Sequence, residues 1–118
     1  MKKSYYLKYG SDKTKEELKE LLEKKWDIIC AEHDSSYFGV YFNYSGLYAD
    51  KLTITDNYIA SSQEWLYEDN KELISLINIS IFNGKNTEKL SRYKFIKNVF
   101  VQLNVSSVIS DKCVEEDW

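Results

Sequence analysis

The chain has 118 residues, of which 43% are hydrophobic and 15% aromatic, and its 16 basic and 19 acidic residues give a net charge of −3. This length favours one domain spanning residues 1–118, and so aromatic a composition excludes an acidic disordered tail. No apolar run approaches the roughly 18 residues of a membrane span, and none follows the first lysines, so we expect neither a membrane protein nor a secretory signal.

The first expected elements are a strand over Tyr5–Tyr9 and a helix that begins at Thr14. The sequence Thr14-Lys15-Glu16-Glu17 has the form of a capping box, in which the side chains of Thr14 and Glu17 each bind the backbone amide of the other residue. The helix then carries one apolar stripe at helical spacing, formed by Leu18, Leu21, Leu22 and Trp26.

Alternation of apolar and polar residues predicts the strands that follow this helix. In the clearest of them, one face should carry Phe38, Val40 and Phe42, and the other face should carry Tyr37, Tyr41 and Asn43. Because an alternating strand is buried on one side only, these patterns indicate a sheet with one apolar face.

Two further strands are expected around Leu52–Ile54 and Ile77–Ile81, where the alternation is also regular. Weaker patterns predict strands over Asp27–Glu32 and Val105–Ile109. The segment Ser61–Leu73 fits neither period, so it stays unassigned.

A second helix follows the turn sequence Phe82-Asn83-Gly84 and should run from about Thr87 to Gln102. Lys94 and Lys97 should point away from its apolar stripe. That stripe consists of Tyr93, Ile96, Val99, Phe100 and Leu103.

The order of these elements is β-α-β-β-β, an irregular stretch, and then β-α-β. It predicts an α+β fold, a two-layer sandwich in which a mostly antiparallel sheet carries two helices on one face. The opposite face should then be open to solvent or to a ligand. It would present Tyr37, Tyr41, Thr53, Thr55, Asn78 and Ser80.

No residue pattern typical of an enzyme, a metal site or a cofactor site is present. The only histidine, His33, lies between Glu32 and Asp34, but a typical zinc or iron triad needs a second histidine. A disulfide between Cys30 and Cys113 is not expected in a chain without an export signal. We therefore expect no enzyme, no catalytic residues, no metal and no cofactor.

Charge is divided unevenly along the chain. Residues 26–81 hold nine acidic and two basic side chains together with many of the aromatic residues, whereas residues 82–97 hold five basic side chains and one acidic. Carboxylates beside tyrosine and tryptophan favour a docking surface for a basic partner, although they also fit an ordinary solvated surface. Two alternatives remain: a nucleic-acid-binding or regulatory module that uses residues 85–97, and a small hydrolase or ligand-binding domain with a pocket around Tyr37 and Tyr41.

The stretches Glu32–Phe42 and Gly46–Ile54 resemble small bacterial immunity proteins that are encoded beside contact-dependent growth inhibition systems or other polymorphic toxins. The resemblance lies in the size, the absence of proline, the abundant tyrosine and asparagine, and the acidic centre. It implies a cytoplasmic protein that binds the C-terminal domain of one cognate toxin, often a nuclease, and blocks its active site.

The candidate partner-binding residues are chosen from charge and aromatic character alone. Opposite the lysines and arginines of a toxin we expect Asp50, Asp56, Glu64, Glu68 and Asp69. As desolvated anchors we expect Tyr44, Tyr48, Trp65 and Tyr67.

Overall fold

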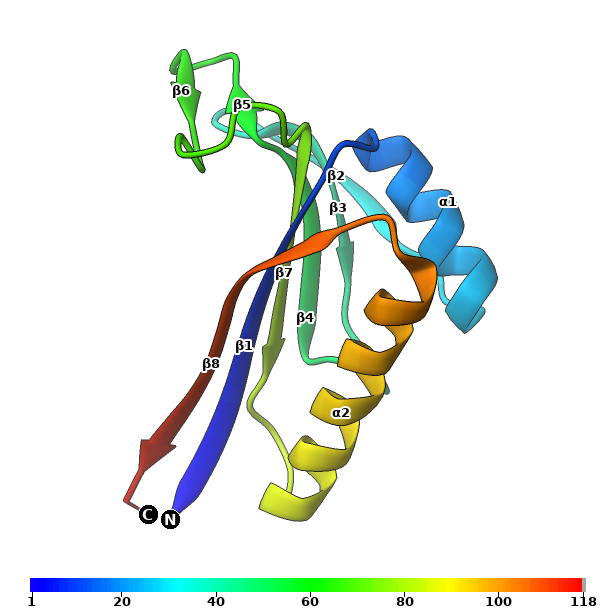
Figure 1. Ribbon diagram of the computed structural model, residues 1–118, viewed down its shortest axis with the longest axis vertical. Coiled ribbons are helices and arrows are strands. Elements are labelled where there is room, and N and C mark those ends of the chain that lie inside the picture. The colour runs from blue at the N-terminus through cyan, green and yellow to red at the C-terminus, as the bar shows by residue number, and fades with distance from the viewer. Residues whose placement is uncertain (118) are drawn as a thin grey trace.

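A six-stranded antiparallel sheet carries both helices on one face in the computed structural model, which describes residues 1–117 (Figure 1). The strand order across the sheet is β2-β3-β4-β7-β1-β8, and a two-stranded sheet of β5 and β6 lies beyond one end of it. The predicted α+β fold and its two-layer arrangement are confirmed. The elements are β1 (Lys2–Ser11), α1 (Lys15–Trp26), β2 (Ala31–Ser35), β3 (Gly39–Tyr44), β4 (Lys51–Asp56), β5 (Tyr58–Ile59), β6 (Glu64–Trp65), β7 (Ser75–Ile81), α2 (Asn86–Leu103) and β8 (Ser107–Glu116).

The capping box predicted for the first helix is present. The Thr14 hydroxyl oxygen accepts from the Glu17 amide at 3.2 Å, and a Glu17 carboxylate oxygen accepts from the Thr14 amide at 3.2 Å. The helix ends at Trp26, and the following residue, Asp27, adopts a left-handed conformation with φ 54°. This turn leaves residues 27–30 outside any strand, so the strand predicted over Asp27–Glu32 was wrong in position and begins at Ala31.

Helix α2 confirms the second predicted helix to within one residue at each end. The direction predicted for Lys97 was wrong, because its Nζ lies 2.7 Å from a carboxylate oxygen of Asp111 on β8. Lys97 therefore fastens the helix to the edge strand. A left-handed Asn104 ends the helix, and its amide donates to the Phe100 carbonyl at 3.2 Å.

Strands β1 and β8 are both longer than the sequence pattern indicated, at ten residues each. They pair along nearly their whole length, with a register shift between Lys8 and Tyr9. Close to this shift the terminal methyl groups of Leu73 and Ile109 lie less than 3.0 Å from where a β-carbon of residue 10 would stand. A larger residue at position 10 would therefore require these two side chains to move.

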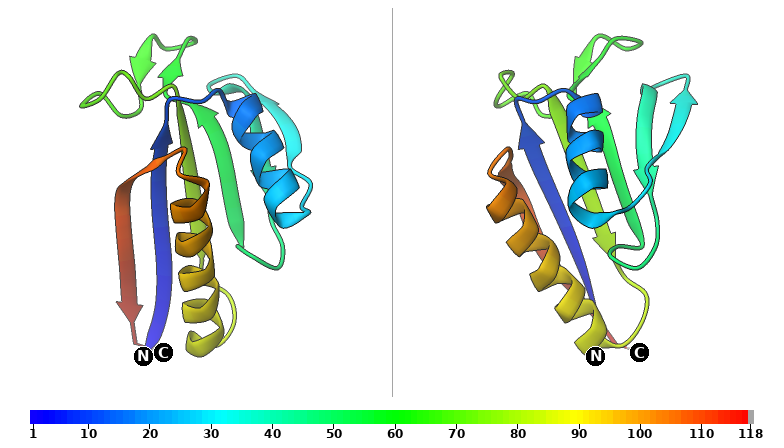
Figure 2. Two further views of the ribbon diagram at one scale, coloured as in Figure 1. Left: turned by 45° about the vertical axis from the view of Figure 1, so that its right-hand side comes forward. Right: turned by 90° about the vertical axis from the view of Figure 1, so that its right-hand side faces the viewer.

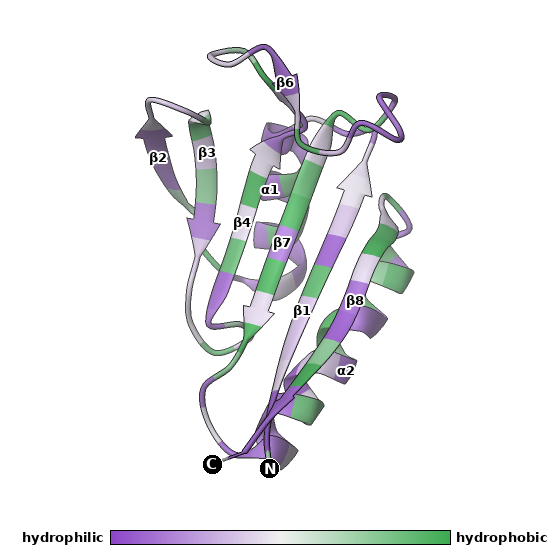
Figure 3. Ribbon diagram, turned by 90° about the vertical axis from the view of Figure 1, so that its left-hand side faces the viewer, coloured by the Kyte–Doolittle hydropathy of each residue, from purple (hydrophilic) through white to green (hydrophobic). Residues whose placement is uncertain are grey.

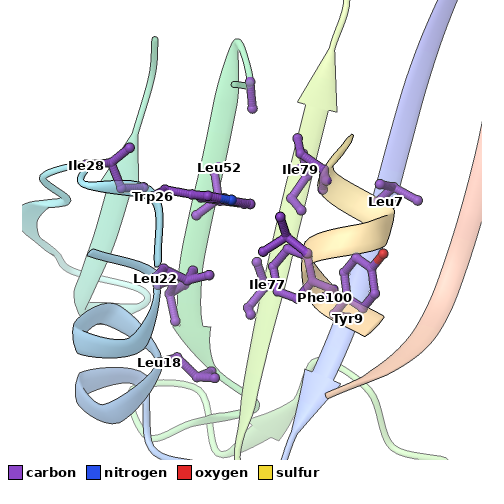
Figure 4. Packing of buried hydrophobic residues seen from close by; sticks show 14 of the residues in the cluster. Leu7, Tyr9, Leu18, Leu22, Trp26, Ile28, Leu52, Ile77, Ile79 and Phe100 are labelled. Carbon is purple, nitrogen blue, oxygen red and sulfur yellow. The ribbon is translucent and has the colours of Figure 1, made fainter. Parts of the chain in front are cut away.

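The core fills the space between the helices and one face of the sheet (Figure 4). Leu18 and Leu22 of α1 are each only 1% exposed and point toward the sheet. From α2, the ring of Phe100 stacks on Tyr9 of β1 with 4.3 Å between ring centroids. The two helices lie side by side over this face, with α1 against β4 and α2 against β1 (Figure 2).

The opposite face of the sheet is not covered by a helix (Figure 3). Tyr41, Thr53, Thr55 and Asn78 lie on it as predicted, because all four line one cavity there. Phe38 lines the same cavity, so its predicted position beside Val40 and Phe42 was wrong. Strand β3 begins at Gly39, which has φ +68°, so Phe38 lies before the strand and does not follow its alternation.

Candidate partner-binding surface

The nine predicted partner-binding residues do not form one surface. Glu64, Trp65, Tyr67, Glu68 and Asp69 lie between β4 and β7, in a segment that projects beyond one end of the sheet (Figure 1). The other four lie on or beside the main sheet, between β3 and the end of β4. They are Tyr44, Tyr48, Asp50 and Asp56.

The carboxylate of Asp50 forms hydrogen bonds and an ion pair within the fold. One carboxylate oxygen accepts from the backbone amides of Phe82 and Asn83 at 2.6 and 2.9 Å, and the other lies 3.7 Å from the Arg92 guanidinium. Burial opposes ionisation of this carboxyl, but the two amides and Arg92 outweigh it, and its pKa is lowered. Asp50 therefore holds the chain at the entry to α2 and is not available as a surface charge.

Asp56 is also paired. Its carboxylate lies 2.7 Å from the Lys15 ammonium, which donates as well to the Val40 carbonyl at 2.7 Å. The side chain of Lys15 is only 12% exposed, so this ion pair ties the first turn of α1 to β3 and β4. The contact gives Asp56 a structural role that the sequence did not indicate.

Tyr44 and Tyr48 pack against the core. The rings of Tyr48, Trp26 and Phe95 form one cluster, in which the Tyr48 centroid lies 5.4 Å from that of Trp26 and 5.3 Å from that of Phe95. Tyr48 also lines a groove of about 760 Å³ between the β3–β4 connection and the outer side of α2. The tyrosines anchor this connection to the helix layer.

Residues 57–74, here called the acidic loop, are organised by one buried side chain. Asn57 is 0% exposed, and its Nδ2 donates to the carbonyls of Tyr67, Asn70 and Leu73 at 3.2, 3.5 and 2.9 Å. Its Oδ1 accepts from the Tyr67 amide at 2.8 Å, and its backbone carbonyl accepts from the Leu66 amide at 2.8 Å. The segment that the sequence left unassigned is thus a fixed structure without regular periodicity.

The acidic loop presents four carboxylates at its surface. Glu64, Glu68, Asp69 and Glu72 are all exposed, and none forms an ion pair with another residue in the described range 1–117. Lys71 is the only basic residue of the segment, and its ammonium lies 5.7 Å from the ring centre of Trp65. The loop therefore keeps a concentrated negative charge on a fixed backbone.

Aromatic residues accompany these carboxylates, including two that sequence reasoning did not assign to the site. The ring centroids of Trp65 and Tyr58 are 5.0 Å apart, and Tyr58 is 42% exposed. The β2–β3 turn joins the loop through Tyr37, whose carbonyl accepts from the Ser61 hydroxyl at 2.5 Å and whose hydroxyl lies 3.5 Å from Glu64. The signal for Tyr58 and Tyr37 was present in the aromatic content of the acidic middle, but their proximity to Trp65 depends on the fold.

The basic residues of α2 are largely engaged within the fold. Lys97 pairs with Asp111, Arg92 contacts Asp50 and donates to the Asn83 carbonyl, and Lys89 is 1% exposed. Exposed cations in this group are Lys85 and Lys94. Of the five cations that the nucleic-acid-binding alternative would use, two are therefore exposed.

The two cysteines are free thiols in different surroundings, Cys113 exposed and Cys30 buried. Burial raises the pKa of the Cys30 thiol to about 11, with a smaller contribution from the nearby Glu23 carboxylate. No cluster of three or more potential metal-ligating side chains occurs within residues 1–117. Over the same range, neither helix is long and apolar enough to cross a membrane.

Comparison with protein-family models, with curated proteins and with solved structures gave no match to this chain. The case for a function therefore depends on the geometry and charge of its own residues.

Proposed function

We propose that this chain is a non-enzymatic immunity protein that binds a basic toxin domain through the acidic loop and covers its active site. The observation that carries the proposal is the combination of a fixed loop backbone with unpaired carboxylates. Asn57 orders the loop from inside, while Glu64, Glu68 and Asp69 remain exposed. A loop ordered before binding loses less conformational entropy on association, which favours high affinity.

The electrostatics favour a cationic partner. Four carboxylates and one lysine lie within residues 57–74, so the loop would attract a positively charged surface and orient it during the encounter. A nuclease groove has this character, because it must bind phosphates. The resemblance to immunity proteins points to the same partner class, and the complex would then form in the cytoplasm.

Trp65, Tyr58 and Tyr37 would supply the contacts that are desolvated in the complex. They surround the carboxylates and offer large rings with polar edges, which are typical of the residues that dominate binding energy at interfaces. Truncation of Trp65 to alanine should therefore weaken binding by about 30-fold, equivalent to about 2 kcal/mol.

The test is to mix the purified protein with the toxin domain encoded immediately upstream and to measure binding by calorimetry and protection in a growth assay. The triple variant Glu64→Gln, Glu68→Gln and Asp69→Asn should lose affinity and protection, and the association rate of the native protein should fall with rising salt. The matched control removes three exposed carboxylates elsewhere, in Asp12→Asn, Glu20→Gln and Asp117→Asn. Equal protection by the two triple variants would contradict the proposal.

A further inference from the structure

The open face of the sheet contains a cavity whose chemistry is opposite to that of the acidic loop. It has a volume of about 310 Å³ and lies over β3, β4, β7 and β1, on the face shown in Figure 3. Phe38 of the β2–β3 turn and Leu66 of the acidic loop form part of its wall. This volume is at the lower end of the range for small-molecule sites, about 300–1,000 Å³.

A row of polar side chains crosses the floor of this cavity. Strand register places Asn43 opposite Thr53, Thr53 opposite Asn78, and Asn78 opposite Lys8, so the row spans four neighbouring strands. Within residues 1–117, no hydrogen bond joins the Asn43 or Asn78 side-chain amide to another residue. Each amide can donate and accept, and both are therefore available to the edge of a ligand.

One polar atom at the cavity is buried without a partner. Thr55 is 4% exposed and lines the cavity, yet its hydroxyl has no hydrogen bond to any residue in the part of the chain that the structure describes. A buried hydroxyl without a partner costs about 1–3 kcal/mol, so such groups are uncommon unless something binds them. The unpartnered Thr55 hydroxyl therefore points to a ligand independently of the charged residues at the cavity.

The cavity is cationic. Lys51 on β4 and Lys8 on β1 both line it, with only β7 between their strands. The register pairs Lys51 with Ser80 and Lys8 with Asn78, so their Cα atoms are about 12 Å apart. No acidic residue lines the cavity, and neither lysine forms an ion pair within residues 1–117. Two free ammonium groups facing one polar floor favour a ligand with a phosphate group.

The side of the cavity near the hairpin is aromatic. Tyr41 and Phe38 lie edge to face with 5.8 Å between their centroids, and His33 stacks on Tyr41 at 5.4 Å. Phe38 remains 36% exposed, so a flat ring can lie against this cluster. Aromatic side chains on an open sheet are a common platform for stacking nucleobases.

We propose that this cavity binds a nucleotide, with the phosphate between Lys8 and Lys51, the base against Phe38 and Tyr41, and the amides of Asn43 and Asn78 at the base edge. The nucleotide can be free or one unit of a single strand, since both present the same phosphate and base. This site shares Leu66 with the acidic loop but uses none of the loop's carboxylates, so it does not depend on the function proposed for the loop.

Titration calorimetry at low salt with 5′-AMP tests the site, with adenosine and inorganic phosphate as partial ligands and a short single-stranded oligonucleotide as the second source. AMP should bind saturably, and each partial ligand should bind at least about tenfold more weakly. The double variant Lys8→Gln and Lys51→Gln should weaken AMP binding by about tenfold or more. The matched control, Lys85→Gln and Lys94→Gln, removes two exposed lysines from α2 and should leave AMP binding unchanged.

Thr55→Val provides a second variant because it keeps the side-chain shape and removes the hydroxyl. It should weaken AMP binding severalfold without lowering the melting temperature, whereas a purely structural threonine would change the melting temperature and leave binding intact. Variants of Glu64, Glu68 and Asp69 should retain AMP binding, which separates this site from the partner-binding loop.

Three results would overturn the proposal: no saturable binding of either AMP or the oligonucleotide, equal binding by the Lys8 and Lys51 double variant, or equal affinity for AMP and inorganic phosphate. Among supporting results, a much higher affinity for the oligonucleotide assigns the site to a single strand. Comparable affinities for the oligonucleotide and AMP assign it to a free nucleotide.

Discussion

The acidic loop and helix α2 carry net charges of opposite sign, −3 over residues 57–74 and +3 over residues 86–103, and the fold uses these charges in opposite ways. In α2, Lys97 pairs with Asp111 and Arg92 contacts Asp50, so the cations connect the helix to the rest of the structure. In the acidic loop, Glu68 and Asp69 are exposed and form no ion pair within residues 1–117. The carboxylates of the acidic loop are therefore more available to a binding partner than the paired cations of α2.

The comparison also separates two sources of order. Helix α2 is ordered by regular backbone hydrogen bonds and by an apolar face that includes Ile96 and Phe100, both nearly fully buried. The acidic loop has only the short pair β5 and β6, and it depends on the buried side chain of Asn57. The loop should therefore be far more sensitive than the helix to the loss of one polar side chain.

Asn57→Ala is expected to have the largest effect. It removes the partner of three carbonyls and one amide, and it should lower the free energy of unfolding by about 3 kcal/mol, because buried backbone groups are left unpaired. Urea denaturation measures this change. The control, Asn98→Ala on the exposed side of α2, should change stability by less than about 0.5 kcal/mol. Similar losses for the two variants would show that the loop is not organised by Asn57.

Much of the helix layer follows from local sequence signals. The Thr14 and Glu17 capping box, the apolar stripe of α1 and the bounds of α2 depend on residues three or four positions apart, and these signals proved reliable. Strand β8 was predicted only in its first part. Most of its residues, from Asp111 to Glu116, are exposed, so they lack the alternation by which a half-buried strand is recognised. Backbone pairing with β1 extends it.

The candidate site was less predictable, because sequence shows which residues carry charge but not which charges are already paired. Asp50 and Asp69 look alike in sequence, yet Asp50 accepts from amides 32 and 33 residues away. Asp56 pairs with Lys15 across 41 residues. Only contacts of this range distinguish a structural carboxylate from one that is free to bind a partner.

Asp50→Asn should have the next largest effect, and it tests whether this carboxylate belongs to the fold. Loss of the ionised acceptor should cost about 2 kcal/mol at pH 7, since hydrogen bonds to a charged group contribute about 1.5–3 kcal/mol. Asp69→Asn, in the acidic loop, should change stability by less than about 0.5 kcal/mol. Urea denaturation of both variants makes the comparison, and equal effects would remove the distinction between the two carboxylates.

The same contacts predict a pH dependence. The pKa of Asp50 in the folded protein lies below its ordinary value of 3.8, so its stabilisation is complete above that value and is lost as the pH falls through the folded pKa. The stability difference between the native protein and Asp50→Asn should therefore be constant at neutral pH and narrow below about pH 4. If the stability difference stayed the same down to about pH 2, the effect of Asp50→Asn would arise from packing and not from the charge of the carboxylate.

The smallest effects come from two lysines that lie three positions apart on α2. Lys97→Gln removes the cation that binds Asp111 at 2.7 Å, but both side chains are partly exposed, so screening limits the loss to about 1 kcal/mol. Lys94→Gln removes an exposed charge and should change stability by less than about 0.5 kcal/mol. Added salt should reduce the Lys97 effect and leave the Lys94 variant unchanged. If the two variants were equally stable, the basic residues of α2 would be as free as the carboxylates of the acidic loop, and nucleic-acid binding by this helix would again need to be considered.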